Sequence, residues 1–127
     1  MDVRYLIRDQ VNELRRRQGK NALQLHEEES ANCKAHASFL AEESEKSGVT
    51  VLRHADPRFL RDWKESLFYY EGGKSVEEAV AHIFSELERV PDEHYYKLLE
   101  AKEFVAGDVV VRGSGQQKKV FLVQRFK

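Results

Sequence analysis

Hydrophobic residues near the start of the chain recur at steps of three and four. The positions are Val3, Leu6, Ile7, Val11 and Leu14. This spacing places them on one stripe of a helix, which we predict to run to about Gln18 and to end at Gly19. Three consecutive arginines, residues 15–17, lie at its end. They suit the negative end of the helix dipole, so we expect them to be solvated.

A second, longer helix is predicted for residues 26–48. Its first turn carries three glutamates, residues 27–29, where the helix dipole favours negative charge, and its middle is rich in alanine. The single cysteine, Cys33, lies among these alanines, which favours a buried, inert thiol over a reactive nucleophile. The β-branched run at residues 49–52 then predicts a short strand that leads to His54.

Residues 63–70 are rich in aromatic side chains and are followed by two glycines, which predicts a strand. Because side chains alternate along a strand, Glu65 shares one face with Trp63 and Leu67. In such an apolar row a carboxylate needs a partner or a raised pKa. We interpret the aromatic side chains mainly as strand core, and the alternative is a patch that holds an apolar ligand or partner.

Two further helices are predicted after this strand. Ser75 and Glu78 have the spacing of a capping box and open a helix with a clear apolar stripe. Steps of 100° per residue place Glu86 at the border of that stripe, where we expect partial burial. Pro91 ends this helix and starts another one, which carries His94.

The tail of the chain is predicted to be a β-hairpin. Two hydrophobic arms, residues 108–112 and 120–126, flank a turn with two glycines at residues 113–117. The predicted order is therefore helix, helix, strand, strand, helix, helix, strand, strand, which favours an α+β fold with a largely antiparallel sheet covered by helices. No linker or repeat divides the chain, so we expect a single domain over residues 1–127.

Composition narrows the classes of function. The chain has 21 Lys and Arg against 22 Asp and Glu, and its formal net charge of −1 argues against nucleic acid or anionic lipid as a partner. Its longest aliphatic run, residues 109–111, is far shorter than the roughly 20 residues of a membrane span, so we expect a soluble protein. The first residues show no secretory signal, which fits either an intracellular protein or a domain excised from a longer one.

Candidate chemistry rests on four polar residues where the local pattern predicts partial burial. They are His54, Glu65, Glu86 and His94. The sequence has no close histidine pair, no Cys-x-x-Cys pair, no nucleotide-binding glycine motif and no nucleophile elbow. Two imidazoles and two carboxylates could bind a divalent cation, carry out general acid–base catalysis, or form a hydrogen-bonded knot that is purely structural.

Several segments carry a resemblance to a known family. Residues 12–19 read Asn-Glu-Leu-Arg-Arg-Arg-Gln-Gly, and residues 31–37 read Ala-Asn-Cys-Lys-Ala-His-Ala. The closing residues 104–111 and 120–126 look like a final pair of strands. Together these segments resemble the CAP superfamily, which comprises the cysteine-rich secretory proteins, antigen 5, the pathogenesis-related proteins of plants and bacterial SCP-like domains. The resemblance extends over about residues 11–126.

The resemblance implies an α-β-α sandwich with a cleft lined by His54, Glu65, Glu86 and His94. Lys-Glu-Ser-Leu at residues 64–67 takes the place of the family's Gly-Glu-Asn-aliphatic motif, which makes Glu65 the first acid. Glu86 matches the family's second acid, and the two histidines match the residues that take a divalent metal such as zinc.

The resemblance also implies a function. Family members bind lipids or interact with other proteins, so we expect a binding module for a small apolar ligand or a protein or peptide partner. The alternative is a hydrolase in which Glu65 or Glu86 activates water. With one cysteine the chain lacks the disulfides of eukaryotic members, which points to a bacterial-type domain. Since the family is mostly secreted, we expect an extracellular domain excised from a longer protein.

Overall fold

The computed structural model describes residues 2–127. Its helices are α1 (Val3–Arg17), α2 (Glu27–Ser47), α3 (Pro57–Leu60), α4 (Val76–Arg89) and α5 (Glu93–Glu100), with a 3-10 turn, η1 (Gly115–Gln117). Its strands are β1 (Gln24–Leu25), β2 (Lys64–Glu71), β3 (Phe104–Arg112) and β4 (Lys119–Phe126). No helix within residues 2–127 is long and apolar enough to cross a membrane.

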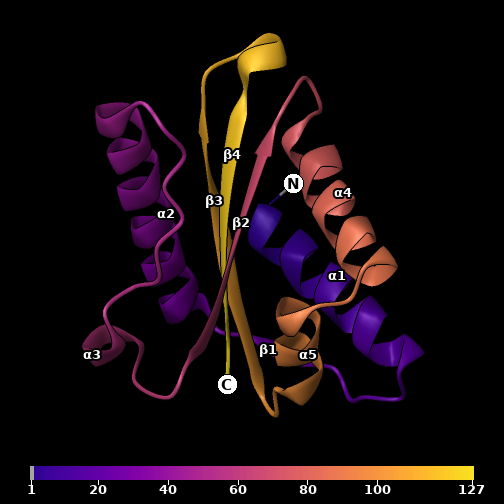
Figure 1. Cartoon of the computed structure of the whole chain (residues 1–127). Helices are drawn as coiled ribbons and strands as arrows, with labels where there is room; N and C mark the ends of the chain where they lie inside the picture. The colour runs from indigo at the N-terminus through magenta and orange to yellow at the C-terminus, as the bar shows by residue number, and fades with distance from the viewer. Residues whose placement is uncertain (1) are drawn as a thin grey trace.

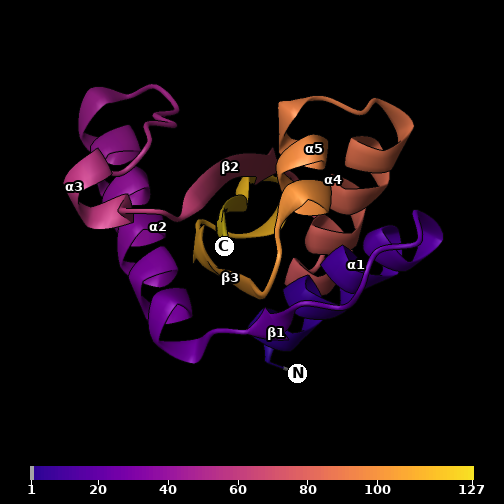
Figure 2. The same cartoon turned by 90° about the horizontal axis from the view of Figure 1, so that it is seen from below.

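The strands form one sheet in the order β1-β3-β4-β2. The short strand β1 runs parallel to β3, and the other two pairs are antiparallel. Helices α2 and α3 cover one face of the sheet and α1, α4 and α5 cover the other, as Figures 1 and 2 show. The predicted α+β sandwich, with a small and largely antiparallel sheet between helices, is therefore confirmed. Strand β2 is an edge of this sheet.

Each face of the sheet has its own hydrophobic core. On the α1/α4/α5 face the core contains large side chains such as Ile7, Phe84 and Leu98. On the α2 face it contains Ala37 and other small residues of α2, so this helix packs closely on the sheet. Cys33 belongs to this second core and is fully buried, and burial raises the pKa of its thiol. The prediction of a buried, inert thiol is confirmed.

The helix boundaries follow local signals that the sequence contains. Helix α2 begins after His26, whose Nδ1 accepts a hydrogen bond from the Glu29 amide, and it ends at Gly48 in the left-handed conformation. Helix α4 begins with the predicted capping box, in which both reciprocal hydrogen bonds of Ser75 and Glu78 are present.

One predicted strand does not form. Residues 49–52 are irregular, because the amide of Val51 donates to Ser44 Oγ at the end of α2 instead of to a neighbouring strand. Two short elements, β1 and α3, were not predicted. A signal for α3 was present, because Asp56 followed by Pro57 is a typical helix start, and Asp56 does cap this helix.

The expectation of three solvated arginines at the end of α1 is wrong for Arg15. This residue is only 3% exposed, and its guanidinium donates to the carbonyl oxygens of Asn21, Leu98 and Leu99. The carbonyls at the end of α5 need donors, and the guanidinium supplies them at the negative end of that helix. Arg16 and Arg17 are exposed, as expected.

Candidate functional site

Glu65 is the most completely bonded of the four predicted residues. It lies on β2, faces α2, and its side chain is 1% exposed. Its Oε1 lies 2.9 Å from His54 Nδ1 and accepts from the amide of Ala55 at 2.9 Å. Its Oε2 accepts from Arg125 Nε at 3.0 Å and from Arg125 Nη2 at 2.9 Å. The expectation that a carboxylate in this apolar row needs a partner is confirmed.

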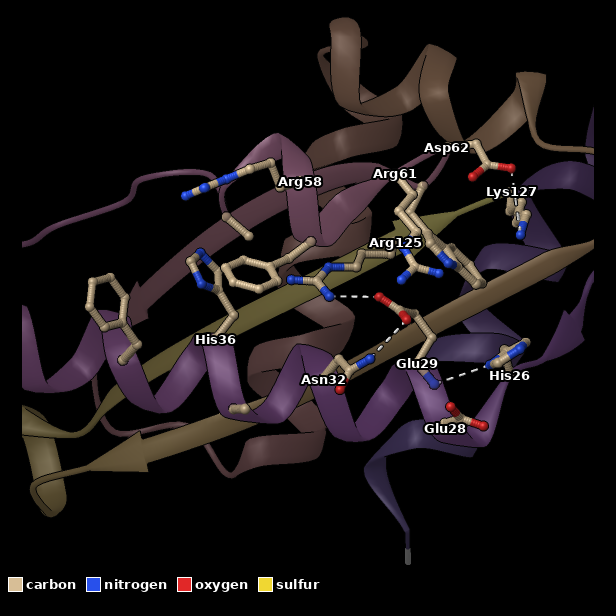
Figure 3. Close-up of a pocket in the computed structure, with 15 residues that line it drawn as sticks. His26, Glu28, Glu29, Asn32, His36, Arg58, Arg61, Asp62, Arg125 and Lys127 are labelled. Carbon is tan, nitrogen blue, oxygen red and sulfur yellow. Dashed lines mark hydrogen bonds and ion pairs between the residues drawn. The ribbon is translucent and has the colours of Figure 1, made fainter.

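Arg125 links Glu65 to a second buried carboxylate. Arg125 Nη1 donates to Glu29 Oε2 at 2.6 Å, and Glu29 Oε1 accepts from Asn32 Nδ2 at 2.9 Å (Figure 3). Burial alone lowers the pKa of Arg125, but the hydrogen bonds to Glu29 and Glu65 outweigh it and raise that pKa. Two carboxylates thus share one guanidinium. We call Glu29, Glu65 and Arg125 the buried charge network.

His54 is one point at which this network reaches solvent. The residue was expected to be partly buried after a strand, but no strand precedes it and its side chain is 54% exposed. Because the carboxylate of Glu65 can only accept, the imidazole donates from Nδ1. Nδ1 is therefore occupied, and Nε2 is the ring nitrogen that remains free to bind a ligand.

His94 is held in a similar way from the other face of the sheet. It lies in the first turn of α5, and its Nδ1 is 3.0 Å from the Oγ of Ser66, the residue after Glu65. Its ring packs 4.9 Å from the ring of Phe68. Burial is the largest effect on His94 and lowers its pKa, although the charge of Asp92 acts in the opposite direction. Burial therefore favours the neutral imidazole.

The two histidines thus contact consecutive residues of one edge strand from opposite sides. We call His54 and His94 the edge histidine pair. Lys97 of α5 satisfies a carbonyl group of this edge strand, because its Nζ donates to the backbone oxygen of Glu65 at 2.8 Å. Each imidazole of the pair uses Nδ1 to hold its position.

Glu86 does not join this arrangement. The partial burial predicted for it is wrong, since its side chain is 46% exposed and forms an ion pair with Arg89 one turn later on α4. Glu86 and His94 do line one hollow of about 690 Å³ between β2 and α4. Within residues 2–127, no group of three or more His, Cys, Asp or Glu side chains is placed to hold a metal ion.

The aromatic residues of the segment 63–70 do not form one patch. Trp63 and Tyr69 belong to the core on the α2 face, whereas Phe68 and Tyr70 pack against the core on the opposite face. Trp63 is buried and the other three are half-buried. The interpretation as strand core is confirmed for most of this surface.

The geometry limits what the two glutamates can do chemically. Both oxygens of Glu65 already accept hydrogen bonds, so this carboxylate is placed to position His54 and not to take a proton from water. Glu86 is bound to Arg89 at the surface. No contact within the described part of the chain favours the hydrolase alternative.

A second cavity, of about 690 Å³, lies between α2 and α3 and was not predicted. Its floor is the Arg125–Glu29 pair, and His26, Arg61 and Trp63 are among its walls (Figure 3). These residues come from separate segments of the chain, so no local sequence pattern indicates the cavity. We call it the α2/α3 cavity.

No protein-family model matches the chain, and no curated protein matches it significantly.

Proposed function

We propose that the chain is a CAP-like binding or interaction domain in which the edge histidine pair takes a divalent cation such as zinc. The observation that carries this proposal is the buried charge network, which ends at the exposed imidazole of His54. Two carboxylates share one guanidinium in this network, so a cation bound next to it would be favourable. His54 could ligate such a cation through Nε2.

The environment of His54 supports a ligand role. Histidines that bind metals usually donate their other ring nitrogen to a carboxylate or carbonyl, which fixes the tautomer and the ring orientation. Glu65 stands in that relation to His54, at 2.9 Å. The Nε2 lone pair of a neutral His54 is then directed away from the sheet.

The environment of His94 supports the same role by different means. A ligand imidazole must be neutral, and burial lowers the pKa of His94. Two imidazole nitrogens fill only part of the coordination shell of zinc, so water or a bound molecule would complete it. These donors suit an open site for recognition better than a closed structural one. When bound, the cation would supply Lewis-acid polarisation of whatever occupies its open positions.

The hollow between β2 and α4 offers a place for the rest of such a ligand. Phe68, Tyr70 and Val90 line it beside His94. Apolar walls next to a few polar groups are typical of small-molecule and peptide sites. A small apolar ligand or a peptide segment is the class of partner that we propose here. The resemblance to bacterial SCP-like domains leads us to propose an extracellular location as well.

Zinc titration by calorimetry at pH 7 tests the cation part of the proposal. We expect the parent protein to bind one zinc ion, and the variant His54→Ala/His94→Ala to lose that binding. His82→Ala is the matched control, because His82 is exposed on α4 and does not belong to the edge histidine pair. Affinity should fall as the pH is lowered below about 6, because protonated imidazoles cannot ligate. Absence of binding to the parent, or equal binding to the double variant, would contradict the proposal.

A further inference from the structure

The α2/α3 cavity contains one cation that has no partner. The side chain of Arg61 makes no hydrogen bond or ion pair with any residue of the range 2–127, and only its backbone amide is bonded, to the carbonyl oxygen of Pro57. The side chain lines the cavity together with Arg125 and Glu29 (Figure 3). The side chain therefore presents five N–H donors and a full positive charge to whatever enters the cavity.

The other cations that line this cavity are already paired. Arg58 binds Asp56, Arg125 binds Glu29 and Glu65, and Lys127 lies 3.6 Å from Asp62. Arg61 thus differs from these cations, because no acidic side chain of the described residues pairs with its guanidinium. An unpaired guanidinium in a concave site is a natural partner for a carboxylate.

The backbone of Arg61 is strained. It has φ 55° and ψ −120°, and it is the only residue other than glycine with a positive φ in residues 2–127. Side chains with a Cβ are disfavoured in this region of backbone conformation, which glycine occupies freely. A strained residue that persists in a cavity wall indicates a functional demand on its side chain.

The apolar walls of the cavity indicate the rest of the ligand. Phe59 of α3 is 73% exposed and Phe39 of α2 is 41% exposed, and both line the cavity. The ring of His36 stacks on Phe39 with 5.7 Å between the centroids. The Arg53 guanidinium also lies 5.5 Å from the centroid of the Phe39 ring, so Phe59 is the aromatic side chain that offers a free surface to a planar apolar group.

Three acidic residues line the cavity and limit the negative charge of the ligand. Glu29 is paired with Arg125, and Asp62 lies 3.6 Å from Lys127. Glu28 lines the cavity without a basic partner in the described residues, at the start of α2 and away from Arg61 in Figure 3. It disfavours a second negative charge on the ligand. The walls therefore suit a molecule with one carboxylate and one ring.

We propose that the α2/α3 cavity binds small aromatic monocarboxylates, with the carboxylate on Arg61 and the ring against Phe59. This site is separate from the edge histidine pair, because neither His54 nor His94 lines the cavity. It would therefore remain even if zinc binding failed.

The test is an NMR titration with benzoate, phenylacetate and 3-phenylpropionate, followed through the indole N–H of Trp63 and the amides of α2 and α3. We expect saturable shifts from at least one acid, and none from the corresponding neutral amides. The variant Arg61→Gly should bind about ten- to a hundredfold more weakly, as expected for the loss of a hydrogen-bonded charge pair.

Two controls separate ligand recognition from folding. Arg16→Gln removes an exposed arginine outside the cavity that is already paired with Glu13, so its affinity should stay within about twofold of the parent. Arg61→Gly should also melt no lower than the parent, because glycine relieves the strain at φ 55°. The proposal is overturned if no acid gives saturable shifts, if acids and amides bind alike, or if Arg61→Gly binds as the parent does.

Discussion

Two arginines of this protein are equally buried and differ in every partner. Arg15 and Arg125 are each 3% exposed, and they lie on opposite faces of the sheet. Arg15 donates only to backbone carbonyls, at the end of α5 and in the turn after α1. Arg125 donates only to carboxylates, those of Glu29 and Glu65. Burial alone therefore does not distinguish a structural arginine from one in a candidate site.

The partners of each arginine make the distinction. The contacts of Arg15 end inside the fold, where the guanidinium satisfies carbonyl groups that would otherwise lack donors. Those of Arg125 continue through Glu65 to His54, whose side chain is 54% exposed. The contacts of Arg125 therefore connect the core to the protein surface, whereas those of Arg15 do not.

The largest expected effect is that of Arg125→Met. Removing the guanidinium leaves two buried carboxylates without their partner, and breaking a buried ion pair in this way costs about 3–5 kcal/mol. Urea unfolding followed by circular dichroism measures this loss. Combining Arg125→Met with Glu29→Met and Glu65→Leu should restore much of the stability, because the buried charges are then gone. A loss below about 1 kcal/mol for Arg125→Met would show that the network is hydrated and not buried.

Arg15→Met should have a smaller effect. Here the groups left behind are neutral carbonyls, and unsatisfied buried polar groups cost about 1–3 kcal/mol. Burial lowers the pKa of Arg15, so part of the loss is offset by relief of its desolvation. The same urea measurement compares the two variants directly. If Arg15→Met cost as much as Arg125→Met, the contrast between carbonyl and carboxylate partners would not govern stability.

The smallest effect concerns the pH dependence contributed by His94. Its pKa is lowered by burial in the folded protein, so the unfolded chain binds more protons in the range between the two values. The contribution is present in full above the unfolded value of 6.5 and is lost as the pH falls through the lower folded value. His94→Gln should flatten this part of the stability curve. If the free energy of unfolding of His94→Gln changed with pH as steeply as that of the parent, another group would be responsible for this pH dependence.

The sequence predicted the fold well because the signals were local. The capping box at Ser75 and the glycine that ends α2 are each contained within a few residues, and both appear in the structure. Alternation along β2 also predicted the buried face of Glu65. Such features depend only on neighbouring positions in the chain.

The candidate site was less predictable because it depends on pairing between distant strands. Arg125 lies opposite Glu65 only in the register of β2 with β4, and nothing near Arg125 in the sequence indicates this. Glu29 was attributed to the helix dipole, although its carboxylate turns toward Arg125. Glu86 was placed at the border of an apolar stripe, and Arg89 holds it at the surface.

The most direct test of the edge histidine pair is the ¹⁵N spectrum of the histidine side chains during a zinc titration at pH 7. The account predicts that Nε2 of His54 and of His94 shift together with the same dependence on zinc, while Nδ1 of His54 stays protonated on Glu65. The rings of His36 and His82 should stay unchanged. If neither ring of the pair responds, or if all the histidines shift alike, the edge histidine pair is not a cation site.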